Sequence, residues 1–385
     1  MNNIYLDYAA TTPVDERVRA AMQPYFTQIF GNPSSLHQFG QQAESALEKS
    51  RRELAGFLGA KPSEIIFTSC GSESDNLAIR GAAFAARQKS GANHLLISPI
   101  EHPAVLKTAS QLANLHGFDL DFLPVDKFGV VSPAGVRENL REDTFLVSVM
   151  QANNEIGTLN PIAEIGDICR ERCIPLHTDA VQSGAHFPLD VNSIKVDLLS
   201  LGAHKFYGPK GVGALYIRSG TELSPILTGG AQEFGQRAAT QNIPLIVGMA
   251  KAFELVQIEH NARINHILPL RDKLIEQVLT KIPSSQLTGH PEERLVNHAS
   301  FVFEGVDGNL LISILDAAGF ACSSGSACKT GDPEPSLVLT QLGYSPSWAL
   351  GSLRVTLGKD TTAEEIDSFL KILPGCIHQL RELKS

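Results

Sequence analysis

A short apolar run leads into a small polar turn at residues 65–73, which read Ile65-Ile66-Phe67-Thr68-Ser69-Cys70-Gly71-Ser72-Glu73. The first four residues predict a strand, and residues 77–88 predict the helix that follows it. A turn of Ser and Gly at this place lets backbone N–H groups approach an anion, and the start of a helix favours negative charge. Simple capping of the helix explains the same turn, so both interpretations stay open on these residues alone.

The alternation of strand and helix continues to about residue 220. Apolar runs that predict further strands stand at residues 94–98, 145–150, 174–178, 198–201 and 212–217. Loops rich in Gly, Ser, Asn and Pro follow these runs. The pattern is typical of an α/β fold with a mostly parallel sheet and helices on both faces. Polar residues gather just after the strands, at the carboxyl edge where open α/β sheets bind ligands.

The pattern changes near the C-terminal end. A helix is expected at residues 251–280, and strands are expected at 300–303 and 353–357. Thr362 and Glu365 have the spacing of a capping box, which predicts the start of a final helix.

The length of 385 residues exceeds what one hydrophobic core usually supports. We therefore expect two domains: a large one over residues 14–259, and a smaller α+β one formed by residues 1–13 and 260–385.

Composition excludes several classes of function. The net charge of −9 argues against broad electrostatic binding to nucleic acid. No apolar run approaches the ~20 residues of a membrane helix, and Met1–Asp7 has no basic and apolar leader pattern. Six scattered cysteines form no disulfide framework, so a reducing, cytoplasmic location is expected.

Lys205 directly follows a predicted buried strand and is surrounded by glycines in the segment Ser200–Gly211. A solvated surface lysine is the ordinary alternative. The apolar run before it favours a sheltered amine, and a lysine with a lowered pKa can form a Schiff base.

Two further polar residues follow strands. Asp179 could pair with a pyridinium nitrogen or cap the next helix. His102, in Glu101-His102-Pro103, could stack on a flat cofactor or transfer protons, and a purely structural role is the alternative.

The segment from Ala321 to Pro335 is small and polar in composition, which predicts an exposed, mobile loop. Cys328 within it is a candidate reactive thiol, and Lys329 would favour its thiolate. Cys322, at the apolar end, is expected to be buried and inert.

The other cysteines are expected to be structural. Cys169 and Cys173 stand near His177, but no second pair completes a zinc site, so no metal is expected. Cys70 is predicted to be a packed turn residue, and Cys376 to pack within a helix.

Taken in this order, the segments resemble the cysteine desulfurases of the class V aminotransferase group, which are fold-type I pyridoxal-phosphate enzymes. The resemblance covers nearly the whole chain and rests on the following stretches: Tyr5-Leu6-Asp7-Tyr8-Ala9-Ala10-Thr11-Thr12-Pro13, Gly31-Asn32-Pro33-Ser34-Ser35, Glu101-His102, Asn153-Asn154-Glu155-Ile156-Gly157-Thr158, Asp179-Ala180-Val181-Gln182, His204-Lys205-Phe206-Tyr207-Gly208-Pro209-Lys210-Gly211, the Cys328 loop and Leu353-Arg354. The long loop, Ser323-Ser324-Gly325-Ser326-Ala327-Cys328, resembles the type that serves iron–sulfur assembly and often tRNA thiolation.

The resemblance implies roles for the cofactor residues. Lys205 would bind pyridoxal 5'-phosphate covalently and later act as the base at the substrate Cα. Asp179 would pair with the ring nitrogen, Gln182 would bond the ring hydroxyl, and His102 would stack on the ring and assist proton transfer.

It also implies how the phosphate and the substrate are held. The phosphate would lie against Gly71, Ser72, His204 and Thr240, with Thr240 coming from the second subunit of a homodimer. Arg354 and Asn154 would bind the substrate carboxylate, a task that suits the guanidinium fork.

The implied reaction converts L-cysteine to L-alanine and leaves the sulfur on Cys328 as a persulfide. A sulfur acceptor or an iron–sulfur scaffold protein would then take it. A selenocysteine lyase or a C–S lyase would share Lys205 and Asp179, but neither accounts as well for the Cys328 loop. An inactive scaffold subunit is an alternative of another class.

The chain departs from the family pattern at two places. Gly202 stands where the family usually has Ser, and Phe234 stands where it usually has Arg. The missing serine hydroxyl predicts weaker retention of the cofactor than is usual for the family.

Overall fold

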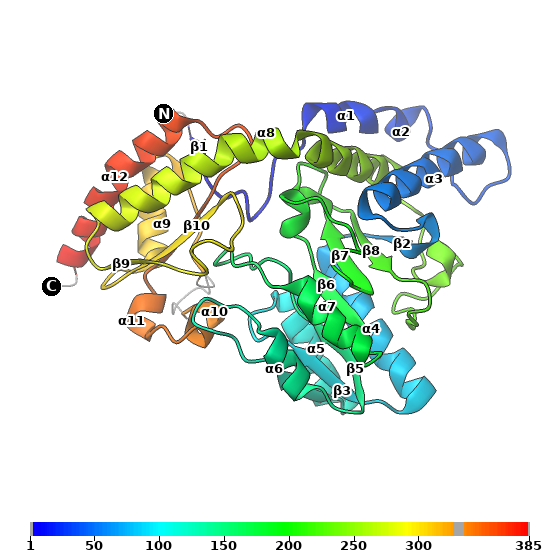
Figure 1. The fold of residues 1–385 in the computed structure, drawn as a ribbon. Helices are drawn as coiled ribbons and strands as arrows, with labels where there is room; N and C mark the ends of the chain where they lie inside the picture. Colours follow the sequence, from blue (N-terminus) through cyan, green and yellow to red (C-terminus); the bar gives the residue numbers. More distant parts are fainter. Residues whose placement is uncertain (1–2, 326–334, 384–385) are drawn as a thin grey trace.

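The computed structural model describes residues 3–325 and 335–383 (Figure 1). Cys328, the candidate sulfur acceptor, lies outside the described residues.

A seven-stranded sheet forms the centre of the larger part of the molecule (Figure 1). Its strands are ordered β2-β8-β7-β6-β5-β3-β4, and only β8 runs antiparallel to its neighbours. Their bounds are β2 Ile65–Thr68, β3 His94–Ile97, β4 Asp119–Phe122, β5 Thr144–Ser148, β6 Leu176–Asp179, β7 Leu198–Gly202 and β8 Gly213–Ile217. The predicted α/β class with a mostly parallel sheet is confirmed.

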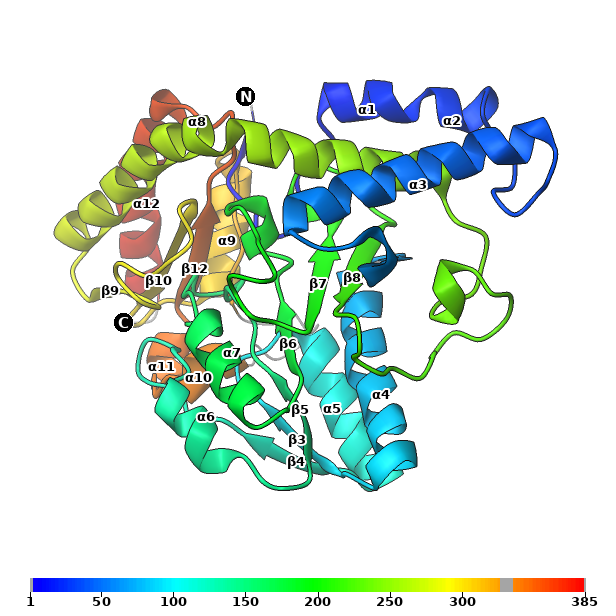
Figure 2. The same ribbon diagram turned by 45° about the vertical axis from the view of Figure 1, so that its right-hand side comes forward.

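Helices cover both faces of this sheet, because alternate strand residues point to opposite sides. Ile65 and Phe67 pack in a core with α3 (Gln38–Leu58), α7 (Ile162–Glu171) and the first half of α8 (Ile243–Lys281). Ile66, between them, packs on the other side with α4 (Gly71–Ser90) and α5 (Pro103–His116). Figure 2 shows α4 and α5 on one side of the sheet and α7 on the other.

The six predicted strands of this sheet are present, but β4 was missed. Its four residues, Asp119-Leu120-Asp121-Phe122, form an edge strand in which no side chain is fully buried. Its side chains are exposed or half-buried, although Leu120 packs against a core, so the continuous apolar run that marks the other strands is absent there.

Two predicted helices begin earlier than expected. The helix predicted from residue 77 begins at Gly71, and the helix predicted from 251 begins at Ile243. The first shift matters for function, because it brings the start of α4 directly to the polar turn after β2.

A second group of elements lies at the C-terminal end of α8 (Figure 1). An antiparallel sheet of order β12-β10-β9 and a parallel pair, β1 and β11, pack with α9 and α12. Thr362 and Glu365 form the predicted capping box. The bounds are β1 Ile4–Tyr5, β9 Ser285–Leu287, β10 His298–Phe303, α9 Gly308–Ala317, β11 Phe320–Ala321, β12 Ser352–Thr356 and α12 Ala363–Glu382.

The remaining helices are short: α1 Glu16–Met22, α2 Pro24–Thr27, α6 Pro133–Asn139, α10 Leu337–Gln341 and α11 Pro346–Ala349. In the ranges 3–325 and 335–383, no helix is long and apolar enough to cross a membrane. The helix α8 contributes to both main cores, with Ile246–Val256 in one and Ile267–Val278 in the other. The expected division into two domains stays a prediction.

A buried ion pair joins α3 to the loop that precedes α8. Arg51 donates to both carboxylate oxygens of Glu233, at 2.8 and 2.9 Å, and also donates to the Ile65 carbonyl at 2.5 Å. The Glu233 carboxylate accepts a further bond from Phe67 N. Removing one partner of such a pair leaves an uncompensated charge in the core.

We expect Arg51→Ala to lower the free energy of unfolding by about 3–5 kcal/mol, because Glu233 would stay buried without its cation. Urea unfolding followed by circular dichroism measures the change. Arg19→Ala, which breaks the exposed pair with Glu16, is the matched control and should leave the urea midpoint unchanged. Equal midpoints for the two variants would contradict the stabilising role of the buried pair.

Candidate active site

A cavity of about 270 Å³ opens at the carboxyl edge of the large sheet. It is lined by most residues that the sequence predicted for the site: Gly71, Ser72, His102, Asn154, Asp179, Gln182, His204, Lys205 and Arg354. They come from the turns after β2, β3, β5, β6 and β7, and from β12 of the second group of elements. The structure therefore brings together residues as distant in the sequence as Gly71 and Arg354.

Lys205 ends a short 3₁₀ turn directly after β7. Its Nζ donates to the carbonyls of Ala9 and Ala10, at 2.5 and 2.8 Å. Burial, and then the nearby Arg354 cation, lower the pKa of Lys205 to about 8. The amine is sheltered, as the sequence predicted, and close to losing its proton at neutral pH.

Asp179 ends β6, and its side chain lines the cavity. Its Oδ1 accepts from Val181 N at 2.8 Å. The predicted helix cap is not formed by Asp179, because Gln182 is the N-cap of the next 3₁₀ turn. Burial raises the pKa of Asp179, while His102 and Lys205 oppose that rise.

His102 is the N-cap of α5, and its Nδ1 accepts from Ala104 N at 3.1 Å. Burial lowers the pKa of the imidazole, and Lys205 adds to this while Asp179 opposes it. The ring is therefore neutral, with its proton on Nε2, because Nδ1 serves as an acceptor.

The start of α4 faces the cavity through Gly71 and Ser72. The N-cap residue is Cys70, and among the described side chains none caps this end of the helix. A Cβ at position 71 would lie 2.6 Å from Val181 Cγ2, so only glycine fits there. The free N–H groups and the helix dipole suit a phosphate.

Two more predicted cofactor residues complete this wall. His204 Nδ1 lies 3.2 Å from Thr11 Oγ1, and burial lowers the pKa of His204 to about 4, so the ring is neutral. Gln182 donates from Nε2 to the Ala9 carbonyl at 3.0 Å, a bond that fixes the orientation of its amide.

Arg354 is oriented by two bonds. Its Nη2 donates to Asp7 Oδ1 at 2.8 Å and its Nη1 to the Asn154 carbonyl at 2.9 Å. Its buried Nε has no hydrogen-bond partner among the residues that the structure describes. The guanidinium lines the cavity, and a guanidinium suits a substrate carboxylate.

Thr240 and three cysteines were also assigned places by the sequence analysis. Thr240 is exposed and does not line the cavity within the described part of this chain. Cys322 is buried, which raises its thiol pKa to about 12, and Cys376 is buried in α12, both as predicted. The prediction for Cys70 was incomplete, because this half-buried residue also lines the cavity.

Asp75 is a site residue that the sequence reasoning missed. It lines the cavity from the second turn of α4. The helix predicted over residues 77–88 begins after Asp75, so the prediction places this residue on no helix face. A helix starting at Gly71 would have placed Asp75 one turn further along the same face.

Asp75, His102 and Asp179 hold ligand atoms within 4.8 Å of one another, the one group of this kind among the described residues. The group does not include Cys169, Cys173 or His177. Lys205 and Arg354 line the same cavity, and their cationic groups disfavour a divalent ion there.

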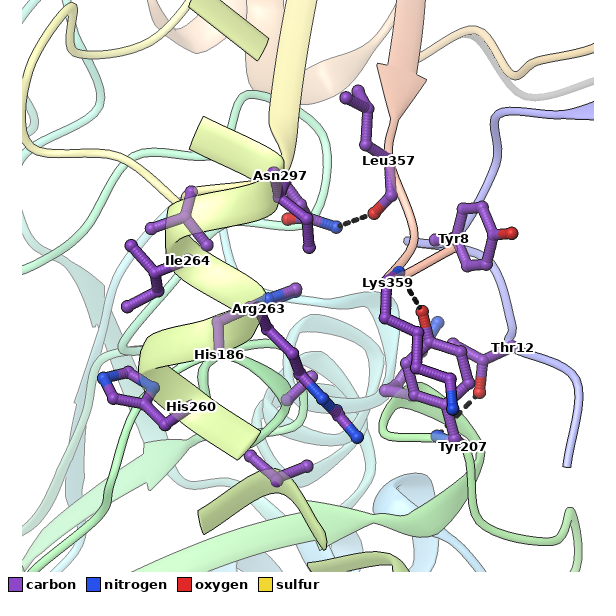
Figure 3. A pocket seen from close by; sticks show the side chains of 15 residues that line it. Tyr8, Thr12, His186, Tyr207, His260, Arg263, Ile264, Asn297, Leu357 and Lys359 are labelled. Carbon is purple, nitrogen blue, oxygen red and sulfur yellow. Dashed lines mark hydrogen bonds between the residues drawn. The ribbon is translucent and has the colours of Figure 1, made fainter. Parts of the chain in front are cut away.

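A second cavity lies on the other side of Lys205, between α8, the end of β12 and the N-terminal segment. Figure 3 shows Tyr8, Tyr207, Arg263, Asn297 and Lys359 around it. Its volume of about 20 Å³ has room for little more than a water molecule. Of these two cavities, only the one lined by Asp179 and Arg354 has room for a cofactor ring.

The model of the aminotransferase class-V family matches residues 4–369. The chain belongs to this family. It is 49% identical to the cysteine desulfurase IscS of Methanosarcina thermophila, over 99% of this chain and 93% of that protein. It is 47% identical to the IscS of Dictyoglomus turgidum, over 99% of this chain and 96% of that protein.

Solved structures agree with this assignment. A NifS-like protein superimposes with a TM-score of 0.91 at 37% identity, covering 98% of this chain and all of that one (100%). The structure described as SspA in complex with cysteine has a TM-score of 0.81 at 37% identity, covering 93% of this chain and 100% of that one. The predicted fold of the pyridoxal-phosphate enzymes is confirmed.

The cofactor of this family, and of this chain, is pyridoxal 5'-phosphate. The cavity fits it by the chemistry of its walls. A sheltered amine at Lys205 suits the aldehyde, a buried carboxylate at Asp179 suits the ring nitrogen, and the start of α4 at Gly71 suits the phosphate.

The rate at which the cofactor-free protein binds pyridoxal phosphate covalently should depend on pH with the pKa of the Lys205 amine. With a pKa of about 8, the neutral fraction rises with pH below 8 and levels off above it. An ordinary lysine would level off only near ~10.4. Stopped-flow absorbance across this pH range measures the rate, with Lys205→Ala as the blank, and a rate still climbing above pH 9 would contradict the lowered pKa.

Proposed function

We propose that the protein is a cysteine desulfurase that converts L-cysteine to L-alanine and transfers the sulfur to Cys328. The observation that carries the proposal is the meeting of Lys205, Asp179 and Arg354 in one cavity. The relatives named cysteine desulfurase, at 47–49% identity over nearly the whole chain, support it.

Substrate binding relies on the second group of elements. Arg354 lines the cavity and binds the carboxylate of cysteine through its guanidinium, which Asp7 fixes in place. Because Asp7 and Arg354 come from opposite ends of the chain, the substrate site needs both ends in place.

Bound pyridoxal phosphate supplies an electron sink at the substrate Cα. Lys205 removes the Cα proton, since its lowered pKa leaves a neutral amine available near neutral pH. His102, neutral and carrying its proton on Nε2, lines the same cavity as a second group for proton transfer.

Sulfur transfer is assigned to Cys328. Its thiolate attacks the substrate sulfur, an S–S bond forms, and the C–S bond breaks with its electron pair left on carbon. That carbon takes up a proton, and the product leaves as alanine. Among the described cysteines, Cys322 is a poor alternative because its thiol pKa of about 12 keeps it protonated.

We also propose a homodimer, with Thr240 of each subunit completing the phosphate site of the other. The exposure of Thr240 outside its own cavity agrees with that arrangement. The persulfide would pass to an iron–sulfur scaffold or another sulfur acceptor in the cytoplasm.

We propose that the chain divides into a large domain, residues 14–259, and a smaller domain formed by residues 1–13 and 260–385.

A C–S lyase or a selenocysteine lyase would use the same cavity. Neither alternative has an observation of its own in its favour.

Alanine release from L-cysteine with a reductant present tests the function. We expect Cys328→Ala to lose at least about 100-fold in rate, because the sulfur has no acceptor. Cys173→Ala, which removes an exposed thiol, is the matched control and should keep the wild-type rate. Equal alanine release from wild type and Cys328→Ala would overturn the role of Cys328 as the sulfur acceptor.

Gly202→Ser should slow dissociation of pyridoxal phosphate by about tenfold, the effect of one hydrogen bond to a charged group. A Cβ at position 202 would lie 3.4 Å from Gly71 N and 3.5 Å from Val181 Cγ1, which are ordinary contacts. The hydroxyl would therefore reach the start of α4 without strain. Gly202→Ala adds the Cβ alone, so equal dissociation rates for the two variants would show that the hydroxyl contributes nothing.

A further inference from the structure

Two buried carboxyl groups face the cofactor cavity from different elements. Asp75 comes from α4 and Asp179 from the end of β6, and their residues are 1% and 5% exposed. A ligand oxygen of each lies within 4.8 Å of the other. Two carboxylates this close in a buried site do not both ionise readily, so the distribution of charge between them has to be decided by their surroundings.

Within residues 3–325 and 335–383, no lysine or arginine forms an ion pair with Asp75. Its one ion-pair contact among the described residues is with His177 Nε2, at 3.6 Å. That imidazole lies between Ser148 Oγ, 2.8 Å from Nδ1, and Ser200 Oγ, 3.0 Å from Nε2. Burial lowers the pKa of His177 to about 3, so the ring is neutral. Asp75 Oδ1 has no hydrogen-bond partner within the described part of the chain.

Asp179 has the surroundings that an anion needs. Its Oδ1 accepts from Val181 N, and both His102 and Lys205 favour its ionised form. One negative charge shared by the two groups is therefore more stable on Asp179 than on Asp75.

The other titratable groups around Asp75 add no positive charge. Asp179, Glu101 and Cys70 all raise its pKa, after the larger effect of burial, and Ser200 opposes them through a hydrogen bond. Burial also raises the pKa of Glu101 well above its usual range, although Glu101 accepts from Met150 N at 2.7 Å.

We propose that Asp75 is a positioning residue that stays protonated and so leaves Asp179 as the single anion opposite the cofactor ring nitrogen. The inference rests on the cofactor site of the proposed function. One carboxylate then balances one pyridinium, and a second buried negative charge is avoided.

Infrared spectroscopy of the holoenzyme tests the protonation directly. Protein labelled with ¹³C-aspartate should show, at neutral pH, a protonated carboxyl band that shifts with the label, which separates it from Glu101. The band should vanish in Asp75→Asn and persist in Asp119→Asn, which removes an exposed acid. A wild-type spectrum without a label-sensitive band would overturn the proposal, even if the variant failed to fold.

The affinity for pyridoxal phosphate, measured by equilibrium dialysis, provides a second test. Asp75→Asn replaces one neutral group by another and should keep the dissociation constant within about threefold, whereas Asp179→Asn should raise it at least about tenfold. Equal weakening by both variants would place the charge on Asp75 and overturn the proposal. Neither measurement uses cysteine, so a protein inactive toward cysteine leaves both tests readable.

Discussion

The parallel alignment of β6 and β7 is the constraint on which the site depends. Asp179 pairs in register with Ser200, so the chain leaves both strands at the same edge of the sheet. Lys205 follows within one short turn. A carboxylate and an amine that are separated along the chain therefore face one cavity, because parallel strands end together.

The N-terminal segment connects this edge to the second group of elements. Its Ile4 pairs with β11, its Asp7 holds Arg354, and its Ala9 and Ala10 carbonyls hold Lys205. Thr12 adds a bond from its hydroxyl to the His204 carbonyl. About a dozen residues at one end of the chain thus hold both the Lys205 amine and the Arg354 guanidinium. This explains how two side chains from different parts of the fold keep fixed positions relative to each other.

Burial is the common cause of the chemistry. Removal from water lowers the pKa of Lys205, keeps His102 and His204 neutral, and raises the pKa of Asp179 and Asp75. The same loss of water would strengthen the attraction between Asp179 and a pyridinium nitrogen. Burial therefore makes the amine reactive and at the same time limits how many charges the cavity can hold.

The α/β class and most strands of the large sheet could be predicted from the amino-acid sequence, because buried strands leave apolar runs. Lys205, Asp179 and His102 could be singled out because polar residues after parallel strands meet at one edge of the sheet. Gln182, His204, Asn154 and Arg354 were predicted only from the resemblance to the cysteine desulfurases. Four features leave no local pattern in the sequence and depend on tertiary structure. They are the half-exposed edge strand β4, the start of α4 at Gly71, the hydrogen bond from Arg354 to Asp7, and the approach of Asp75 to Asp179. These features depend on contacts between segments far apart in the chain. The energy of such contacts is set by burial and distance, and not by the residues adjacent in sequence.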